Sequence, residues 1–405
     1  MNIRIAWRNI WRNRKRTFIT VSSVILAVTL SSFMRSFQEG TYAKMIENAV
    51  GQFTGYVQVH QKDYWDDKTL DNGIELSDSL INTVLTTPGV EGVDLRLESF
   101  SLAAYKNKSK GALIMGIVPD TANDMLNLHT KIVSGEFLAK NDYGVLLGQK
   151  LSQYLDISVG DTLVLLGQGH WGQSATGAFP VRGIVKMPAP DIDRQLLIMP
   201  LSTAQDFFSF PNGITSVVVK FNDPDNTREI TAELNSRLDT AQYTAMTWQE
   251  MSPELVQLID SDRIGGIAML AILYMIIAFG VFGTVLMMTE ERKKEFGVMV
   301  AIGMQKTRLI AISFYEALFI NSIGIITGLF VGFLLVLYFH YFPIVMTGEN
   351  AQSMEKLGVE PVLPTILSLK IFLFQAFNVL MITVVAAFYP VISIGRLKVI
   401  KALRR

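Results

Sequence analysis

The chain has 405 residues, of which 50% are hydrophobic and 18% are charged, and its mean hydropathy is +0.32. It is too apolar for an average soluble protein, yet its 36 acidic and 36 basic residues are too many for a protein buried entirely in lipid. The averages therefore predict a protein that is part membrane-embedded and part water-soluble. The absence of cysteine excludes a disulfide framework, and the four histidines lie too far apart in sequence to indicate a metal site.

The first residues of the chain predict an amphipathic helix at a membrane surface. Six basic residues and no acidic one lie within residues 1–16. Apolar residues recur there at helical spacing, namely Ile3, Trp7, Ile10 and Trp11. The alternative is a cleaved signal peptide, but the sequence around Ser31–Met34 lacks a small-x-small cleavage site.

Four apolar runs are long enough to cross a hydrocarbon core of roughly 30 Å, which takes about 20 helical residues. We expect transmembrane helices at 17–37, 264–288, 309–342 and 366–394. Within the last three runs, the only Asp, Glu, Lys or Arg residues are Glu316 and Lys370. Four spans are therefore expected.

The charges beside these runs predict the orientation. Residues 1–16 hold six Lys or Arg, the insert at 289–308 holds five and the tail at 395–405 holds five, whereas the loop at 343–365 holds one. Because basic residues in short segments stay on the cytoplasmic side, both termini and the insert are expected in the cytoplasm. The segment at 38–262 then lies outside, in the periplasm of a cell with an inner membrane. It has 29 acidic and 16 basic residues, a net charge of 16 − 29 = −13.

The segment at 38–262 predicts a large mixed α+β domain inserted between the first two spans. It begins and ends with helical continuations of those spans, and strand-like and helix-like patterns alternate between them. We expect helices at 75–85 and 224–238, a hairpin turn at 106–111, and two lobes on a helical stalk. The fold class is thus an α-helical membrane protein with four spans and an external α+β domain.

One motif invites a ligand-binding interpretation that we do not adopt. GQGHWG at 167–172 matches G-x-G-x-x-G, but a dinucleotide site needs this motif to open a helix after a strand, and here no helical period follows. The sequence has no G-x-x-x-x-G-K-[ST], so we expect no cofactor bound by this chain, and no ATP. We also expect no enzymatic activity and no nucleic-acid partner.

The third run carries a stripe of small residues and one acid. Gly324, Gly328 and Gly332 recur every four residues, which permits close approach of another helix, either within the chain or from a second subunit. Glu316 lies two turns inside the span, where an acid needs a partner or water. A structural hydrogen bond is favoured over a proton relay.

The insert EERKKEFGVMVAIGMQKTRL (290–309) predicts a docking helix. A solvated loop would explain its charges but not its apolar middle, whereas a short helix with charged shoulders suits a groove on a cytoplasmic partner. Gly303 and Gln305 suit a break before the next span.

The motif ERKKEFGVMVAIGM (291–304) resembles the E-R-x-x-E-I-G-x-x-R-A-[LI]-G-A signature of the FtsX-like permeases, which include MacB-like pumps and lipoprotein-releasing (Lol-type) permeases. The run at 314–332 is similar to that family's F-x-x-E…G-x-x-x-G run. The tail from 389 resembles its ending, with Gly395 and Val399 off the pattern, and the sequence at 134–166 resembles its external domain. Val300 stands where the family often has Arg. The positions that match are Glu291, Arg292, Glu295, Gly297 and Gly303. The resemblance implies that these residues, together with Phe296, take part in ATPase coupling.

The resemblance implies a pair of permease chains, identical or not, with two copies of a cytoplasmic ABC ATPase that bind ATP and Mg. The insert would be the coupling helix, and the external domain would move when the ATPases close. Lol-type permeases carry an extended loop that engages a periplasmic lipoprotein carrier, whereas MacB-like chains have a tight turn. GQGHWGQSATG (167–177) is interpreted as such a loop, with Gln168, His170, Trp171 and Gln173 as contacts. Lipoprotein release is favoured, and export of peptides, drugs or lipids and signalling to an external partner remain alternatives.

Overall fold

The computed structural model describes residues 2–12, 14–140, 142–356 and 360–397. It separates into two compact units. The membrane unit comprises residues 1–42, 258–345 and 362–405, and the external unit comprises 43–257 and 346–361. Each unit is described by itself.

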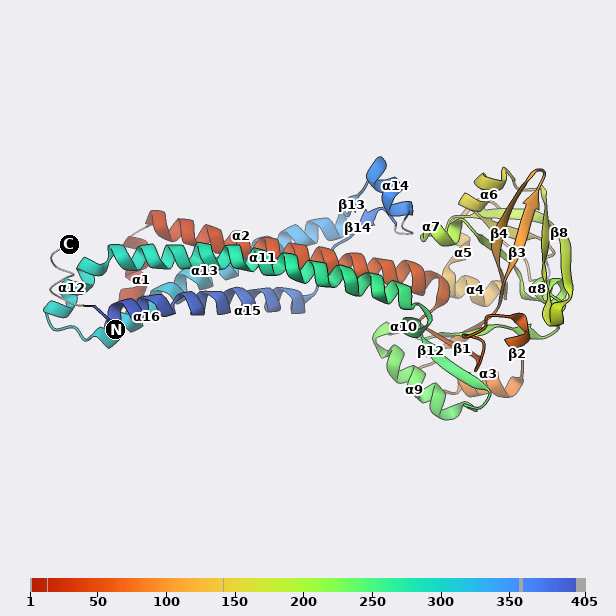
Figure 1. Ribbon diagram of the computed structural model, residues 1–405, viewed down its shortest axis with the longest axis horizontal. Helices are drawn as coiled ribbons and strands as arrows, with labels where there is room; N and C mark the ends of the chain where they lie inside the picture. The colour runs from red at the N-terminus through yellow and green to blue at the C-terminus, as the bar shows by residue number, and fades with distance from the viewer. Residues whose placement is uncertain (1, 13, 141, 357–359, 398–405) are drawn as a thin grey trace. The chain divides into compact units, whose positions relative to one another are not determined.

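The membrane unit is built from long helices (Figure 1). Their bounds are α1 (Asn2–Arg12), α2 (Arg14–Ile46), α11 (Pro253–Glu291), α12 (Lys293–Ala301), α13 (Lys306–Tyr341), α15 (Leu369–Ala386) and α16 (Phe388–Gly395), with a short hairpin of β13 (Ile344–Val345) and β14 (Val362–Leu363). Four helical segments are long and apolar enough to cross a membrane: Thr17–Thr54, Pro253–Glu291, Lys306–Tyr341 and Leu369–Gly395. The first extends well beyond residue 37, because α2 runs on into a π-helix, η1 (Glu47–Thr54).

The fourth membrane helix begins later than the sequence predicts. It starts at Leu369 rather than at residue 366. Ile366 is held to α2 instead, because its amide donates to the Ser36 carbonyl at 3.2 Å and its carbonyl accepts from Ser36 Oγ at 2.5 Å.

The buried core of the membrane unit draws on every span. Val24 and Val28 of α2 pack with Val281 of α11, Ile325 of α13 and Val379 of α15. The remaining large apolar side chains of these helices are mostly exposed in the isolated chain, as expected of surfaces that face lipid.

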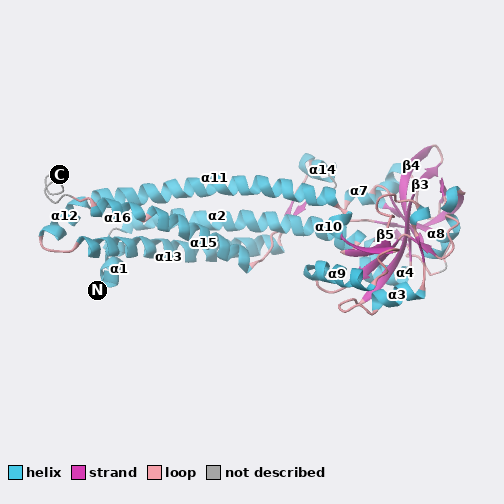
Figure 2. Ribbon diagram, turned by 60° about the horizontal axis from the view of Figure 1, so that its bottom comes forward, coloured by secondary structure: helices cyan, strands magenta, loops and turns pink. Residues whose placement is uncertain are grey.

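Over the residues that the structure describes, the external unit is made of short helices and strands (Figure 2), with twelve strands in all. The strands are β1 (Val57–Gln61), β2 (Ile74–Glu75), β3 (Gly92–Tyr105), β4 (Lys108–Ile117), β5 (Ile132–Gly135), β6 (Val145–Gly148), β7 (Thr162–Gln168), β8 (Ser174–Val185), β9 (Leu196–Pro200), β10 (Gly213–Ile214), β11 (Ser216–Lys220) and β12 (Tyr243–Thr247). The longer helices are α3 (Asp78–Leu85), α4 (Pro119–Leu126), α6 (Gln149–Leu155), α8 (Leu201–Phe207), α9 (Thr227–Arg237) and α14 (Glu349–Lys356). Short turns of helix complete it, namely η2 (Leu70–Asn72), α5 (Leu128–Lys131), η3 (His170–Gly172), α7 (Pro190–Asp193), η4 (Pro224–Asn226) and α10 (Trp248–Met251).

Six strands close into a ring, because β3 pairs with β4, β4 with β9, β9 with β6, β6 with β8, β8 with β7 and β7 again with β3. Strand β3 also pairs with β11, which continues to β1 and β12. The long strand β3 therefore belongs both to a small barrel and to an open sheet. The fold class predicted from the sequence, four apolar helices with a mixed α and β domain between the first two, is confirmed.

Several local predictions need correction. The helix expected at 75–85 begins at Asp78, after Ser77 caps it by accepting from the Leu80 amide, and Ile74–Glu75 instead pair with β10. Strand β4 begins at Lys108, so the hairpin turn is only Lys106–Asn107, with Lys106 at φ 52°. The loop expected at 343–365 contains helix α14.

Candidate functional site

The segment between the second and third membrane helices folds as a short helix with a sharp break at each end. Helix α11 ends at Glu291, and α12 begins after Arg292 and spans nine residues. Gly303 ends the segment at φ +97°, a left-handed conformation that favours glycine, and its amide donates to the Val300 carbonyl at 3.1 Å. The chain then turns into α13 at Lys306.

The apolar residues of α12 divide between two faces. Phe296 is 3% exposed and packs with Leu309, Ile394 and Leu397 of the same chain, and Val300 lies against this cluster. The outward face carries Val298 at 45% and Ile302 at 79% exposure. Phe296, one of the residues expected to take part in ATPase coupling, therefore has its ring buried within the membrane unit, and the outward face of α12 is formed by other residues.

Four charged side chains link α12 to two other helices. Arg12 of α1 donates through Nη2 to both carboxylate oxygens of Glu295, at 2.8 and 2.6 Å. Arg292 lies 3.4 Å from Glu295, and its Nη1 donates to Glu316 Oε2 of α13 at 2.6 Å. The alternating chain Arg12–Glu295–Arg292–Glu316 thus joins the N-terminal helix, the start of α12 and the third span. We call these four residues the coupling relay.

The electrostatics of the coupling relay change from exposed to buried along its length. The Arg12–Glu295 end is about half exposed, whereas the side chains of Arg292 and Glu316 are 14% and 5% exposed. Burial opposes ionisation of Glu295, but the hydrogen bond and charge of Arg12, together with Arg292, hold its pKa below the ordinary value. Arg292 also lies over the Phe296 ring, 5.2 Å from its centroid, so the buried apolar cluster and the relay meet.

The partner of Glu316 is one that the sequence alone did not identify. A structural hydrogen bond was favoured there, and the structure provides a charged one from Arg292. The signal was present, since a buried acid in a span needs a counter-charge and the Arg of the insert is a nearby basic residue. On the neighbouring turn, Glu290 accepts from Tyr389 at 2.8 Å and pairs with Lys293, so the same region contacts α16 as well.

The glycine stripe of α13 lies against α2 of the same chain. A Cβ on Gly324 would meet the Val24 side chain at 2.7 Å, and one on Gly328 would meet the Val28 side chain at 2.9 Å. Gly332 is looser, since the nearest atom to its Cβ is 3.4 Å away. Of the two alternatives for this stripe, packing within the chain is the one the structure shows.

Comparison with known proteins identifies the family. The MacB-like periplasmic core domain matches residues 17–237, and the FtsX-like permease C-terminal domain matches residues 267–399. The chain is a MacB-like, FtsX-type ABC permease.

Curated relatives of this permease include three lipoprotein-releasing LolC proteins. The LolC protein of Xylella fastidiosa (strain Temecula1) is 24% identical over 80% of this chain and 78% of its own length, and that of Neisseria meningitidis is 19% identical over 79% and 76%. The MacB 2 macrolide export ATP-binding/permease protein of Aeromonas hydrophila is 20% identical over 83% of this chain and 53% of its own length. Among solved structures, the periplasmic region of MacB from Actinobacillus actinomycetemcomitans covers 54% of this chain at 20% identity, with a TM-score of 0.36.

The external loop of the permease is shorter than the sequence predicts. Pairing of β7 with β8 continues to Gln168 and Ser174, so the connection is only residues 169–173. Trp171 sits there at φ 54° and is 74% exposed, while the Asp71 carboxylate accepts from its amide at 2.7 Å and His170 stacks on Phe210. The extended loop expected at 167–177 is therefore a tight, well-anchored turn that presents one tryptophan.

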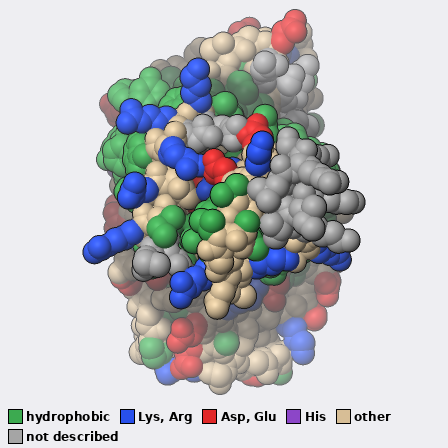
Figure 3. All heavy atoms as spheres, turned by 90° about the vertical axis from the view of Figure 1, so that its left-hand side faces the viewer, with side chains coloured by type: hydrophobic (Ala, Val, Ile, Leu, Met, Phe, Trp, Pro, Cys, Tyr) green, Lys and Arg blue, Asp and Glu red, His purple; other side chains and the backbone are tan. Residues whose placement is uncertain are grey.

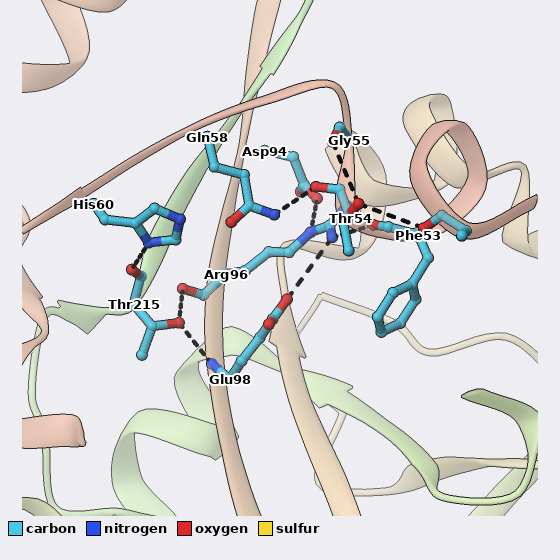
Figure 4. Close-up of polar contacts among 10 residues, drawn as sticks. Phe53, Thr54, Gly55, Gln58, His60, Asp94, Arg96, Glu98 and Thr215 are labelled. Atoms are coloured by element: carbon cyan, nitrogen blue, oxygen red, sulfur yellow. Dashed lines mark hydrogen bonds and ion pairs between the residues drawn. The ribbon is translucent and has the colours of Figure 1, made fainter. Parts of the chain in front are cut away.

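The permease also has a buried polar cluster in its external unit that sequence reasoning missed (Figure 4). Arg96 of β3 is fully buried and pairs with Asp94 at 2.9 Å, and it also donates to the Phe53 carbonyl at the end of η1. Glu98 lies 3.8 Å away, and burial raises its pKa. Arg96 thus fixes the last turn of the first stalk helix to the strand shared by the barrel and the open sheet.

His60 lies on β1, which is separated from β3 by one strand, β11. Its Nδ1 is 2.9 Å from the Thr215 carbonyl, and its ring stacks on Tyr64. Burial lowers the pKa of His60 to about 4, against the hydrogen bond to Thr215, which raises it. Among the residues that the structure describes, no group of acidic, His or Cys side chains has metal-binding geometry.

Proposed function

We propose that this chain is the permease subunit of an ABC transporter whose ATP and Mg are bound by separate ATPase subunits. The coupling relay carries this proposal, because it ties α12 to both α1 and α13 through ion pairs. A force applied to α12 would therefore reach the membrane helices directly. The names of the curated relatives, as permease or ATP-binding/permease proteins, support an ATPase partner.

The proposed ATPase contact is the outward face of α12. Val298 and Ile302 are exposed apolar residues, and Lys294 is exposed beside them. Figure 3 views the end of the molecule that carries α12, where basic side chains are numerous. This distribution supports a cytoplasmic location under the positive-inside rule. The proposed complex contains two permease chains and two ATPases.

The docking face is tested by Ile302→Glu, which places a charge where an apolar contact is expected. We expect ATPase binding to weaken tenfold or more, because a central interface residue contributes about 2 kcal/mol or more. Val133→Glu, at a residue 52% exposed on β5 of the external unit, is the matched control and should bind ATPase normally. Equal ATPase co-purification with both variants would contradict the proposed contact.

For the substrate, we propose lipoproteins, extracted from the inner membrane and passed to a periplasmic carrier. Three LolC relatives support this, together with the exposed Trp171. The test is ATP-dependent release of a lipid-modified protein from proteoliposomes that contain the permease and its ATPase, with Trp171→Ser compared with wild type. Normal ATPase binding without any lipoprotein release would contradict the substrate and leave the ATPase coupling standing.

The short turn at 169–173 favours a second candidate. A tight turn is the arrangement expected of MacB-like chains, so export of peptides, drugs or lipids is the alternative. Transport of such a compound into inside-out vesicles, without lipoprotein release, would select it. Signalling to an external partner would show neither activity.

A further inference from the structure

A cavity of about 700 Å³ lies inside the membrane unit, toward the end of the spans that leads to the external domain. Three helices enclose it: α2 contributes Arg35 and Glu39, α11 contributes residues 267–274, and α15 contributes residues 370–378. Its size falls within the roughly 300–1,000 Å³ of ordinary ligand pockets. None of its lining residues belongs to the coupling relay.

The walls of the cavity are mainly apolar and open toward the lipid-facing surface. Leu270 is buried in its wall, whereas Ile267 and Phe374 at its rim are 55% and 63% exposed. Both rim residues lie within membrane-spanning helices, so the solvent at the rim is hydrocarbon. An empty gap here would lose the dispersion contacts of its lining atoms, so an acyl chain is the natural filler.

The deep wall of the cavity is polar, and its polar side chains hydrogen-bond to one another. Tyr274 donates to Gln375, which is 1% exposed, and Asn378 donates to the Tyr274 hydroxyl at 3.2 Å. This network holds α11 against α15 and leaves the wall rigid. It also offers no free charge to a ligand.

The mouth of the cavity carries a net positive charge. Arg35 and Glu39 pair at 2.5 Å and cancel one another. Lys370, exposed in the first turn of α15, forms no ion pair with any residue that the structure describes. The net charge of the lining is therefore +1, from Arg35, Glu39 and Lys370.

We propose that this cavity binds one anionic phospholipid of the outer leaflet, with its phosphate at Lys370 and an acyl chain along Ile267, Leu270 and Phe374. The proposed ligand is a lipid of the surrounding bilayer. The site does not depend on the ATPase contact or on the transported substrate. A lysine ammonium is a suitable point charge for a phosphate group. Ala271 also lines the cavity and is exposed, so a larger side chain there should occupy the cavity without disturbing the buried core.

The test is native mass spectrometry of the full chain, delipidated in detergent and titrated with dioleoyl phosphatidylglycerol or dioleoyl phosphatidylcholine. We expect about fivefold tighter binding of phosphatidylglycerol, the effect of about one favourable lysine contact with anionic lipid. Lys370→Gln should abolish this preference while Lys294→Gln, at an exposed lysine on α12, should preserve it. Ala271→Trp should remove the bound lipid of either kind.

Three results would overturn the proposal. The first is that wild type and Lys370→Gln each bind the two lipids equally well, and the second is that Ala271→Trp binds lipid as wild type does. The third is that a second copy of the chain covers the cavity. Because the chain has no cysteine, Ile267→Cys reports this directly, and complete disulfide cross-linking between two copies in membranes would rule out lipid as the occupant.

Discussion

Glu316 is an acid inside a membrane helix, and Arg292 supplies its counter-charge from the segment between the second and third spans. Their side chains are 2.6 Å apart and both are mostly buried. Removing one partner of a buried pair leaves the other uncompensated, which costs about 3–5 kcal/mol. The pair is therefore a point where the position of α12 and that of α13 are strongly linked.

Glu316→Gln should preserve ATPase binding, because the outward face of α12 is untouched, but reduce ATP-driven activity severely. The measurement is ATPase co-purification together with transport in proteoliposomes. The exchanged pair Arg292→Glu with Glu316→Arg should recover part of the activity. Full coupled activity in Glu316→Gln would show that the ion pair does not transmit force.

His60 gives the external unit a predictable response to pH. Its pKa is about 4 in the folded chain because of burial, and near 6.5 when unfolded, so the unfolded state binds more protons between these values. Stability is therefore complete above about pH 6.5 and falls by up to about 3 kcal/mol as pH drops toward 4. Glu98 acts in the opposite direction, since its pKa is raised by burial.

His60→Asn isolates this effect, because the Asn amide can still donate to the Thr215 carbonyl but does not titrate. We expect a shallower fall of the unfolding temperature between pH 7 and pH 4.5 than in wild type. The comparison is made on the full chain in detergent, with Trp65 fluorescence as a probe, since that ring lies 5.1 Å from His60. Parallel curves for the two proteins would show that His60 is not the group that titrates.

At the scale of elements, the packing of α13 on α2 depends on two glycines. Gly328→Ala should destabilise the chain by about 1–3 kcal/mol, because its Cβ would meet Val28 at 2.9 Å and the Ile25 backbone at 3.0 Å. Gly332→Ala, with 3.4 Å to its nearest neighbour, is the matched control and should be close to neutral. Thermal unfolding in detergent separates the two. An equal change in unfolding temperature for both variants would show that the close contact of Gly328 with α2 does not set the difference, since Ala raises helix propensity at both positions.

Sequence patterns predicted the elements of this chain better than its contacts. Hydropathy located four spans, and period-two patterns located strands such as β7, in which exposed and buried residues alternate, although β1 is buried along most of its length. Helix α4 and strand β5 were missed, since their short segments carry no period long enough to count. The closure of six strands into a barrel depends on which strands pair, and no local pattern encodes that.

The candidate site was predicted in the same uneven way. The insert and its signature residues were identified from charge and family resemblance, but the sequence did not indicate that Phe296 is buried against the same chain. A nine-residue helix leaves its rotation undetermined by sequence, and only the apolar residues of α13 and α16 decide which side is buried. The ion pairs from Arg12 and to Glu316 join residues 283 and 24 positions away, beyond any local pattern.

At the scale of the whole molecule, orientation is the property most open to a direct experiment. Basic flanks predict α12 inside and the external unit outside. In the cysteine-free chain, Lys294→Cys should react with an impermeant maleimide only after the cells are permeabilised, and Tyr154→Cys, at a residue 52% exposed on α6, should react in intact spheroplasts. The reverse pattern would invert the topology and exclude a cytoplasmic ATPase contact.

The pairing of β1 with β12 has a consequence for biosynthesis. These strands are the first and last of the external unit, and register partners such as Val59 and Ala245 lie 186 positions apart. The open sheet cannot be completed until nearly the whole unit has emerged from the ribosome and crossed the membrane. Contacts so distant in sequence form slowly and leave strand edges unpaired meanwhile. We infer that the barrel, whose strands lie between residues 92 and 200, folds first. Chaperones or proteases would then act on the nascent chain while the open sheet is still incomplete.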